Sequence, residues 1–263
     1  MSNYLLNGFV LESHDHGEKD VIVTIFSYEK GKTSFIVRGT KKLNSSLRSA
    51  TEPLIEGSFF LAPRKTLDIL TEWNPIDCYR GIKGDLEKLS IAQYVLRFMI
   101  EFTQENNGDI YIYNLFKNTL NILQTEYPYD IMRPLFEWGF LMVSGLTPEI
   151  GVCSVCGEKC KGNKSGWDIK EGGFVCEKCG GSENRDKFVL DSTALKFAEF
   201  INKFARNMVE KSYSMEELES IVNKVEKYRS WPVASVRSFQ TALIRFCQFH
   251  LREDIPAWLV DLN

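Results

Sequence analysis

The sequence predicts an α+β protein of several domains, with a small β domain first, helices after it, and a four-cysteine zinc module inserted among the helices. Three observations predict this fold. Up to about residue 80, short runs rich in Val, Ile and Phe alternate with turn residues. Apolar residues then recur at helical spacing. Two CxxC motifs lie in a glycine-rich stretch that lacks such periodicity.

Composition sets the limits of the interpretation. The 263 residues are enough for one to three domains with a sizeable core, and 44% hydrophobic residues are ordinary for a globular protein. The net charge of −3 weakly disfavours a nucleic-acid partner, because a polyanion usually binds a positive surface. The N-terminus lacks a basic-then-apolar signal pattern and no long apolar run occurs, so we expect a cytosolic protein. In a reducing cytosol, seven cysteines favour metal binding over disulfides.

Residues 1–80 are predicted to form the β domain. Gly, Pro or charged residues separate the candidate strands, which predicts a small barrel or sandwich. The five candidate strands are Tyr4–Ser13, Asp20–Tyr28, Thr33–Arg38, Leu54–Leu61 and Leu67–Trp73.

Helices are predicted on both sides of the cysteine-rich stretch. The predicted helices are Leu86–Phe102, Ile110–Thr125, Asp130–Ser144, Thr193–Val209, one from Ser214 to Lys227, and one from Pro232 to about Arg252. Asp191 or Ser192 is placed to cap the fourth of these, and Ser214 and Glu217 have the spacing of a capping box. The chain therefore divides into a β domain (1–80), a first helical part (81–150), the zinc module (151–187) and a second helical part (188–263).

The two CxxC motifs predict a structural zinc site. Cys153 and Cys156 form one motif, Cys176 and Cys179 form the other, and 19 residues separate them. Zinc takes four ligands tetrahedrally, and a CxxC turn directs two thiolates at one ion. Four thiolates complete the coordination shell, so no position remains for a catalytic water. The alternative is two loose thiol pairs or a redox dithiol.

Three further cysteines need other interpretations. Cys160 is a rival ligand, but its four-residue offset from Cys156 fits a CxxC turn less well, so we expect it to stay outside the site. Cys78 and Cys247 lie in a strand-like and a helical run, where a buried cysteine usually acts as a small hydrophobe.

A basic segment lies in the β domain. It contains six basic residues and no acid between its ends: Lys30, Lys32, Arg38, Lys41, Lys42 and Arg48. A cationic loop beside aromatic strand faces is how small barrels bind single strands, since charge follows the phosphates and rings stack on bases. The aromatic candidates are Phe26, Phe35 and Phe59. The alternative is a solvated loop with core phenylalanines.

Common catalytic motifs are missing from the sequence. It contains no P-loop, no GxGxxG after a strand and no GxSxG, and its acidic residues are scattered. A protein without catalytic turnover is therefore favoured.

Several local motifs resemble the bacterial RecO family of recombination mediators. They are Gly8–Ser13, Gly17–Asp20, Val23–Phe26, Glu29–Lys32, Val37–Lys42, Pro53, and Gly145-Leu-Thr-Pro148 leading into Cys153-Ser-Val-Cys156-Gly157, with Leu243–Leu251 in the last helix. The resemblance covers nearly the whole chain. It implies that the β domain is an OB-fold, that the two helical parts form one domain, and that the zinc module is inserted into it.

The resemblance also implies a function and partners. RecO proteins bind single- and double-stranded DNA, anneal strands, and with RecR help to load RecA onto DNA coated by single-strand-binding protein (SSB). The family's basic loop corresponds to Arg38, Lys41, Lys42 and Arg48. The acidic tail of SSB would suit an apolar pocket rimmed by arginines, for which the last helix offers Arg237, Arg245 and Arg252.

Two classes of function stay open at this point. The first is a cytoplasmic, nucleoid-associated DNA-binding mediator without catalysis. The second is a nucleic-acid-processing enzyme with a structural zinc ribbon.

Overall fold

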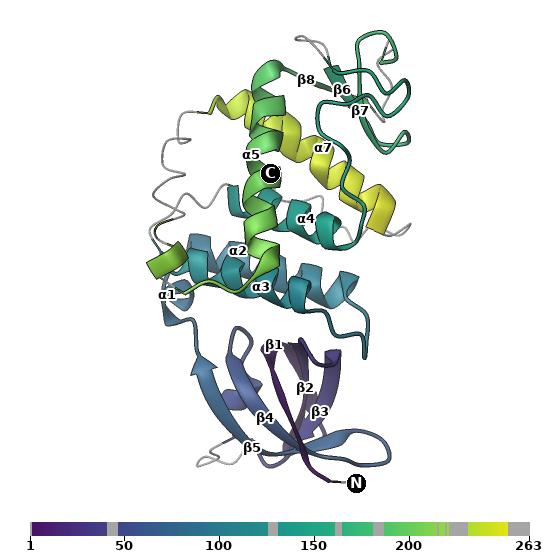
Figure 1. Ribbon diagram of the computed structural model, residues 1–263. Coiled ribbons are helices and arrows are strands. Elements are labelled where there is room, and N and C mark those ends of the chain that lie inside the picture. The colour runs from purple at the N-terminus through teal and green to yellow at the C-terminus, as the bar shows by residue number, and fades with distance from the viewer. Residues whose placement is uncertain are drawn as a thin grey trace. The chain divides into compact units, whose positions relative to one another are not determined.

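The computed structural model describes residues 2–40, 47–125, 131–160, 165–180, 187–214, 216–218, 220 and 231–251 (Figure 1). Its contacts divide the chain into two compact units, residues 1–129 (unit 1) and 130–263 (unit 2). The finer four-part division of the sequence stays a prediction.

Unit 1 begins with a closed barrel of five strands in the order β1-β2-β3-β5-β4 (Figure 1). The strands are β1 (Tyr4–His16), β2 (Asp20–Ser27), β3 (Gly31–Val37), β4 (Glu56–Ala62) and β5 (Asp68–Asp77). Long β1 pairs with β4 through its first half and with β2 through most of its length, and a register shift separates Val10 from Glu12. Among the pairs of barrel strands, β3–β5 is parallel and the others are antiparallel. This OB-like barrel confirms the predicted fold of the N-terminal domain.

Alternate residues of each strand fill the barrel. Leu6, Val10, Val23, Phe35 and Phe59 belong to one buried cluster. The Phe35 and Phe59 ring centroids lie 5.6 Å apart. Because successive strand residues point to opposite faces, the period-two pattern of the sequence places these side chains on one side of the sheet.

Three α-helices follow the barrel in the described part of unit 1. They are α1 (Arg80–Lys83), α2 (Leu86–Phe102) and α3 (Ile110–Leu123). Asp85 caps α2 by accepting from the backbone N–H groups of Glu87 and Lys88. Asp109 caps α3 through Tyr111 and Ile112 in the same way. These aspartates satisfy N–H groups that a helix start leaves without partners, which explains why both helices begin where the sequence predicts.

The helices are held closely to the barrel at the β2–β3 turn. Gly31 has a φ of +68°, and a Cβ there would lie 2.2 Å from the carbonyl oxygen of Asn107. A Cβ at Gly108 would lie 2.4 Å from the carbonyl oxygen of Tyr28. The two backbones approach this closely only because both residues are glycine.

A buried carboxylate also joins the barrel to the helices. Glu56 on β4 is 2% exposed. Its side chain accepts hydrogen bonds from Tyr79 at 3.3 Å and Tyr113 at 2.9 Å, and pairs with the Lys117 ammonium at 2.7 Å. Burial, then the nearby Glu56 charge, raises the pKa of both phenols, so they remain hydrogen-bond donors.

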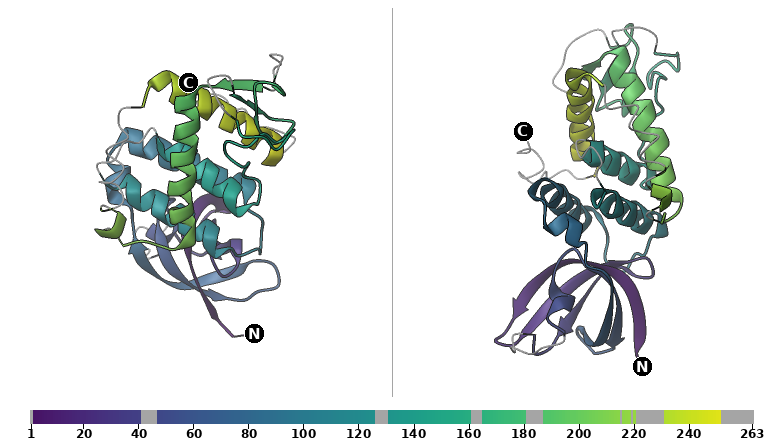
Figure 2. Two further views of the ribbon diagram at one scale, coloured as in Figure 1. Left: turned by 45° about the horizontal axis from the view of Figure 1, so that its top comes forward. Right: turned by 90° about the vertical axis from the view of Figure 1, so that its left-hand side faces the viewer.

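Among the described residues of unit 2, three helices and a three-stranded sheet have defined bounds. The elements are α4 (Met132–Val143), β6 (Ser165–Asp168), β7 (Gly173–Val175), β8 (Lys187–Leu190), α5 (Ser192–Glu210) and α7 (Val233–Leu251). The sheet has the order β7-β6-β8. Helices α5 and α7 pack on α4 and against each other (Figure 2).

The predicted caps in unit 2 are confirmed. Asp191 accepts from the Ala194 N–H at 2.7 Å. Ser214 and Glu217 make the two reciprocal bonds of a capping box. The predicted continuation of that helix to Lys227 lies mostly outside the described residues.

Candidate metal centre and nucleic-acid surface

The four cysteines of the two CxxC motifs come together in unit 2. Cys153 and Cys156 lie between α4 and β6, while Cys176 and Cys179 directly follow β7. Their sulfur atoms all lie within 4.8 Å of one another, and 3.8 Å separates the sulfurs of Cys156 and Cys176. A disulfide would need about 2.05 Å. A tetrahedral ion with bonds of about 2.3 Å to sulfur holds its ligands about 3.8 Å apart, so the cluster has the size for one zinc ion.

The backbone gives both motifs the same turn. The Gly157 N–H donates to the Cys153 carbonyl at 2.9 Å, and the Gly180 N–H donates to the Cys176 carbonyl at 2.8 Å. Gly157 adopts a φ of +72°, which L side chains rarely take. The glycine that follows each motif therefore closes a turn that presents two thiols on one side.

The thiols perturb one another strongly. Burial raises the pKa of Cys153, but hydrogen bonds from the backbone of Cys176, Cys156 and Val155 outweigh it and lower the pKa to about 6. Hydrogen bonds with the thiols of Cys156 and Cys176 raise the pKa of Cys179 to about 12. Four thiolates at this spacing repel one another, so their joint deprotonation requires a cation among them.

Cys160 lies outside this group of four. Burial, followed by the charges of Cys153 and Cys176, raises the pKa of its thiol to about 11. Its backbone N–H donates to the Gly151 carbonyl. The structure therefore brings together the four cysteines that the sequence indicated and separates the rival, while the assignment of these four as zinc ligands stays a prediction. Cys247 is fully buried on α7, as expected of a small hydrophobe, whereas Cys78 is half-buried.

Two members of the predicted DNA-binding loop fall on described residues. Arg38 directly follows β3 and Arg48 directly precedes the short helix η1 (Ser49–Thr51), and both are exposed. Lys41 and Lys42 lie outside the described residues. The Gly39 N–H donates to Asp20 at 2.9 Å, and Ala50 is buried in the barrel core. Both ends of the loop are therefore anchored to the barrel.

Two lysines of the basic segment have internal contacts instead. The Lys32 ammonium donates to the Ile100 carbonyl at 2.6 Å, near the end of α2, where a cation is favoured by the helix dipole. The Lys30 ammonium donates to the Tyr4 hydroxyl at 3.1 Å and lies 4.2 Å from the centre of that ring. Both ammonium groups are therefore engaged within the protein. Fewer than the six basic residues of the segment are available to bind DNA.

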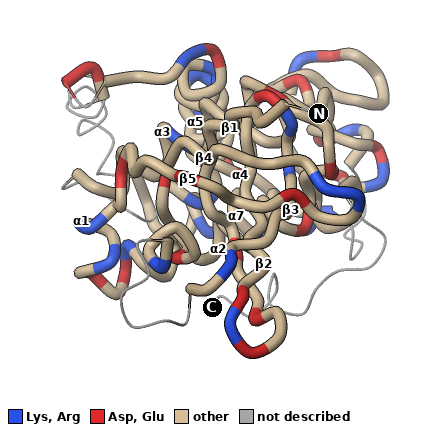
Figure 3. The backbone as a smooth tube through the Cα atoms, turned by 90° about the horizontal axis from the view of Figure 1, so that it is seen from below, with Lys and Arg blue, Asp and Glu red and all other residues tan. Residues whose placement is uncertain are grey.

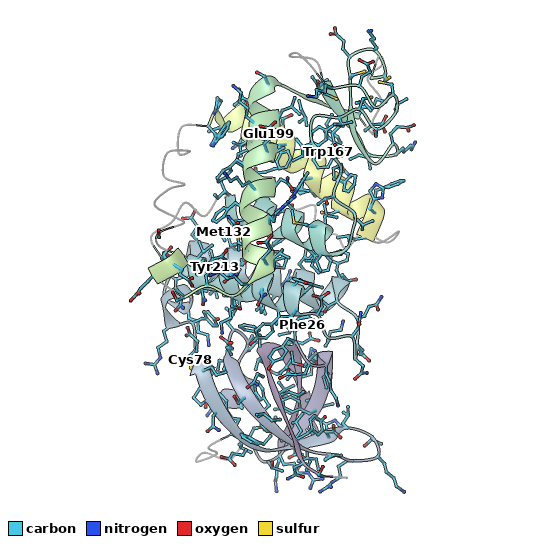
Figure 4. All side chains as sticks on the ribbon, in the orientation of Figure 1. Phe26, Cys78, Met132, Trp167, Glu199 and Tyr213 are labelled. Atoms are coloured by element: carbon cyan, nitrogen blue, oxygen red, sulfur yellow. The ribbon has the colours of Figure 1, made fainter. Side chains whose placement is uncertain are left out.

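The aromatic candidates do not form a stacking platform. Phe26, Phe35 and Phe59 are all 0% exposed and belong to the interior, as the alternative interpretation predicts. Phe26 is labelled in Figure 4. The alternation of residues along the strands indicates a core position for two of these phenylalanines. Phe35 lies two residues before Val37 and Phe59 two residues before Leu61, so each points to the same inward face as that neighbour.

The predicted arginines of the last helix lie partly on one stripe of α7. Arg237 and Arg245 are exposed, with Thr241 between them at helical spacing and Phe249 one turn further on, 53% exposed. Arg252 lies outside the described residues. The described part of this α7 stripe therefore carries two exposed arginines and ends, toward the C-terminus, at an exposed phenylalanine.

Charge on the molecule is mixed. Lys and Arg positions alternate with Asp and Glu along the tube (Figure 3). Within the described residues, no helix is both long and apolar enough to cross a membrane.

The barrel, the helical parts and the four-cysteine cluster define a class of protein: an OB-like barrel followed by helices and a four-cysteine cluster that could hold a metal ion. Sequence comparison identifies the family. The profile described as "Recombination protein O N terminal" matches residues 1–79, and "Recombination protein O C terminal" matches residues 83–258. The chain therefore belongs to the RecO family, which confirms the resemblance.

Named relatives agree with this assignment. "DNA repair protein RecO" of Desulforamulus reducens is 30% identical over 185 residues, covering 70% of this chain and 72% of the relative. The protein of the same name from Alkaliphilus metalliredigens is 28% identical over 222 residues, covering 84% and 85%. That of Bacillus subtilis is 31% identical over 172 residues, covering 65% and 67%.

Proposed function

We propose that this chain is a DNA-repair protein that acts in the cytoplasm, at the nucleoid, as a DNA-binding recombination mediator. It binds single- and double-stranded DNA, anneals complementary strands and, with RecR, assists RecA loading on SSB-coated DNA. The observation that carries the proposal is the match of both halves of the chain to the RecO family, whose relatives are named as DNA repair proteins.

The DNA surface of the proposal is the loop from Arg38 to Arg48. Its two exposed arginines flank Lys41 and Lys42 on an anchored scaffold. Because no exposed aromatic from the expected set stands beside the loop, its contacts are with phosphates and carry little base specificity.

Replacing Lys41 and Lys42 with Glu tests the loop. Each phosphate contact on a single strand contributes roughly 0.7 to the slope of log affinity against log salt, so losing two contacts should flatten that slope by about 1.4. Binding should weaken alike for all sequences, and strand annealing should fall in parallel. Arg64→Glu with Lys65→Glu is the matched control, since it reverses two exposed charges elsewhere on the barrel. Normal binding by the folded loop variant at two salt concentrations would place the DNA surface elsewhere.

The metal in this proposal is one structural zinc ion per chain, held by Cys153, Cys156, Cys176 and Cys179. Zinc bound there supplies folding free energy and leaves no position open for a reacting water. The closed shell gives the zinc a structural role, which both candidate functions share, so turnover has to be tested directly. The alternative of a nucleic-acid-processing enzyme predicts nuclease or ATPase turnover by the purified protein, and the mediator predicts none.

The proposed site for the acidic SSB tail is the α7 stripe. Arginines at Arg237 and Arg245 suit acidic side chains, and Phe249 offers an apolar contact for an aromatic end. Calorimetry with a short aspartate peptide ending in phenylalanine tests this. Arg245→Glu should weaken binding at least tenfold, whereas Lys196→Glu, an exposed residue of α5, should leave it unchanged. Equal binding by both variants would remove α7 from the proposal.

A further inference from the structure

The metal module contributes a central aromatic ring to the core of unit 2. Trp167, on β6, is 0% exposed. Its ring centroid lies 5.8 Å from that of Trp138 on α4, and 5.6 and 5.2 Å from those of Phe239 and Phe246 on α7. Trp167 is labelled in Figure 4. One residue of the module therefore contacts two helices of the unit.

A short path connects this ring to the cysteine cluster. Trp167 stands opposite Phe174 on β7, with ring centroids 5.2 Å apart. The Phe174 carbonyl accepts from both the backbone N–H and the hydroxyl of Ser154, which lies inside the first CxxC motif. Cys176 comes two residues after Phe174. Both halves of the cluster therefore hold β7, and β7 holds Trp167.

The sheet and the residue after β6 also contact α7. Ser238 donates to the Val189 carbonyl of β8 at 3.0 Å, and His250 donates to the Ile169 carbonyl at 3.0 Å. Phe239, Phe246 and His250 share one face of α7. Arg237 and Arg245 point away from that face, and Ser238 lies beside them, seven residues before Arg245. The stripe therefore keeps its position only while the other face stays packed.

The sheet alone is a weak support for this arrangement. Its strands have only three or four residues, at the short end of the range found in globular proteins, so they contribute few ladder hydrogen bonds. The indole N–H of Trp167 is buried without an acceptor among the described residues, so no hydrogen bond of the indole stabilises the buried position of the ring. Small four-cysteine modules generally depend on their metal to fold.

We propose that metal binding at the four-cysteine cluster controls the position of α7, through insertion of Trp167, and so makes docking of the acidic peptide dependent on zinc. This rests on the proposed peptide site. Loss of the metal frees β6 and β7, Trp167 leaves the core, and α7 loosens from α4. Helix α7 also contacts α4 and α5 directly, without Trp167. These contacts remain when the metal is lost, so α7 loosens while unit 2 stays folded.

A buried thiol on α7 reports this directly. Cys247 is 0% exposed and lies near Glu137 and Arg133 of α4, while half-buried Cys78 in unit 1 is an internal control. The full-length protein, zinc-loaded or stripped by chelator, is pulsed with N-ethylmaleimide, and mass spectrometry measures the label at each cysteine. We expect labelling of Cys247 to rise at least tenfold on zinc removal, with Cys78 unchanged. The affinity of the aspartate–phenylalanine peptide should fall at least tenfold.

Variants separate the coupling from a general loss of folding. Trp167→Leu should keep one zinc per chain yet label quickly at Cys247, because the metal no longer has a ring through which to hold α7. Cys160→Ser should behave as wild type. Equal protection of Cys247 with and without zinc overturns the proposal, as does a simultaneous rise at Cys78. If Cys247 responds but neither form binds the peptide, the coupling stands and the proposed peptide site falls.

Discussion

Glu56→Ala is the most informative test of how unit 1 is held together. The change removes a 2% exposed carboxylate and leaves the Lys117 ammonium and two phenols without their acceptor. Removing one partner of a buried ion pair costs about 3–5 kcal/mol. The Lys117 side chain is 26% exposed, so water can solvate part of its charge and the lower end of that range applies.

The phenols add to this cost. Each lost hydrogen bond of Tyr79 and Tyr113 contributes about 0.5–1.5 kcal/mol, so the expected destabilisation is about 4–6 kcal/mol in all. For a unit of this size, that lowers the Tm by roughly 12–30 °C. Glu56→Gln keeps the shape and one acceptor oxygen, and should cost about half as much.

Calorimetry with hydrogen exchange measures the effect, because exchange assigns the transition to unit 1 rather than unit 2. Glu52→Ala is the control. Glu52 pairs with Lys83 at 3.6 Å on the surface, and such pairs contribute about 0–1 kcal/mol. A Glu56→Ala protein that melts within a few degrees of the Glu52→Ala protein would refute the reasoning.

Two further predictions concern unit 2. Cys176→Ser should lose its zinc, whereas Cys160→Ser should keep one ion per chain by metal analysis; the reverse result would show that the ligand set is wrong. Asp191→Ala should cost about 1 kcal/mol, because Asp191 caps α5 and accepts from Ser235 on α7. Burial raises the pKa of Asp191, but hydrogen bonds from Ala194 and Ser235 outweigh it and lower the pKa. Its contribution is therefore present above the unfolded pKa and lost as the pH falls through the folded one. Thermal melts of wild type and variant should converge in acid, and a constant difference would contradict this.

Local sequence determined much of this protein. Alternation with a period of two predicted the barrel strands, and the cap residues Asp191 and Ser214 predicted helix starts, because both signals act between residues close in the chain. The CxxC spacing likewise indicated the four cysteines that the fold brings together, since each pair is formed by a single turn.

Only the tertiary structure determined which side chains of these patterns are exposed and which are engaged in internal contacts. Lys30 and Lys32 count as cations in the sequence, yet Lys32 binds a carbonyl of α2, 68 positions away. Phe26 was a candidate for stacking on bases, with a core position as the alternative, and closure of the barrel and its packing in unit 1 made it inaccessible. Trp167 sits in a stretch without periodicity, and its place among α4 and α7 depends on contacts between distant segments. Burial depends on contacts between segments that are distant in the sequence. A local pattern therefore indicates which residues are candidates for a site, and long-range packing determines which of them remain exposed.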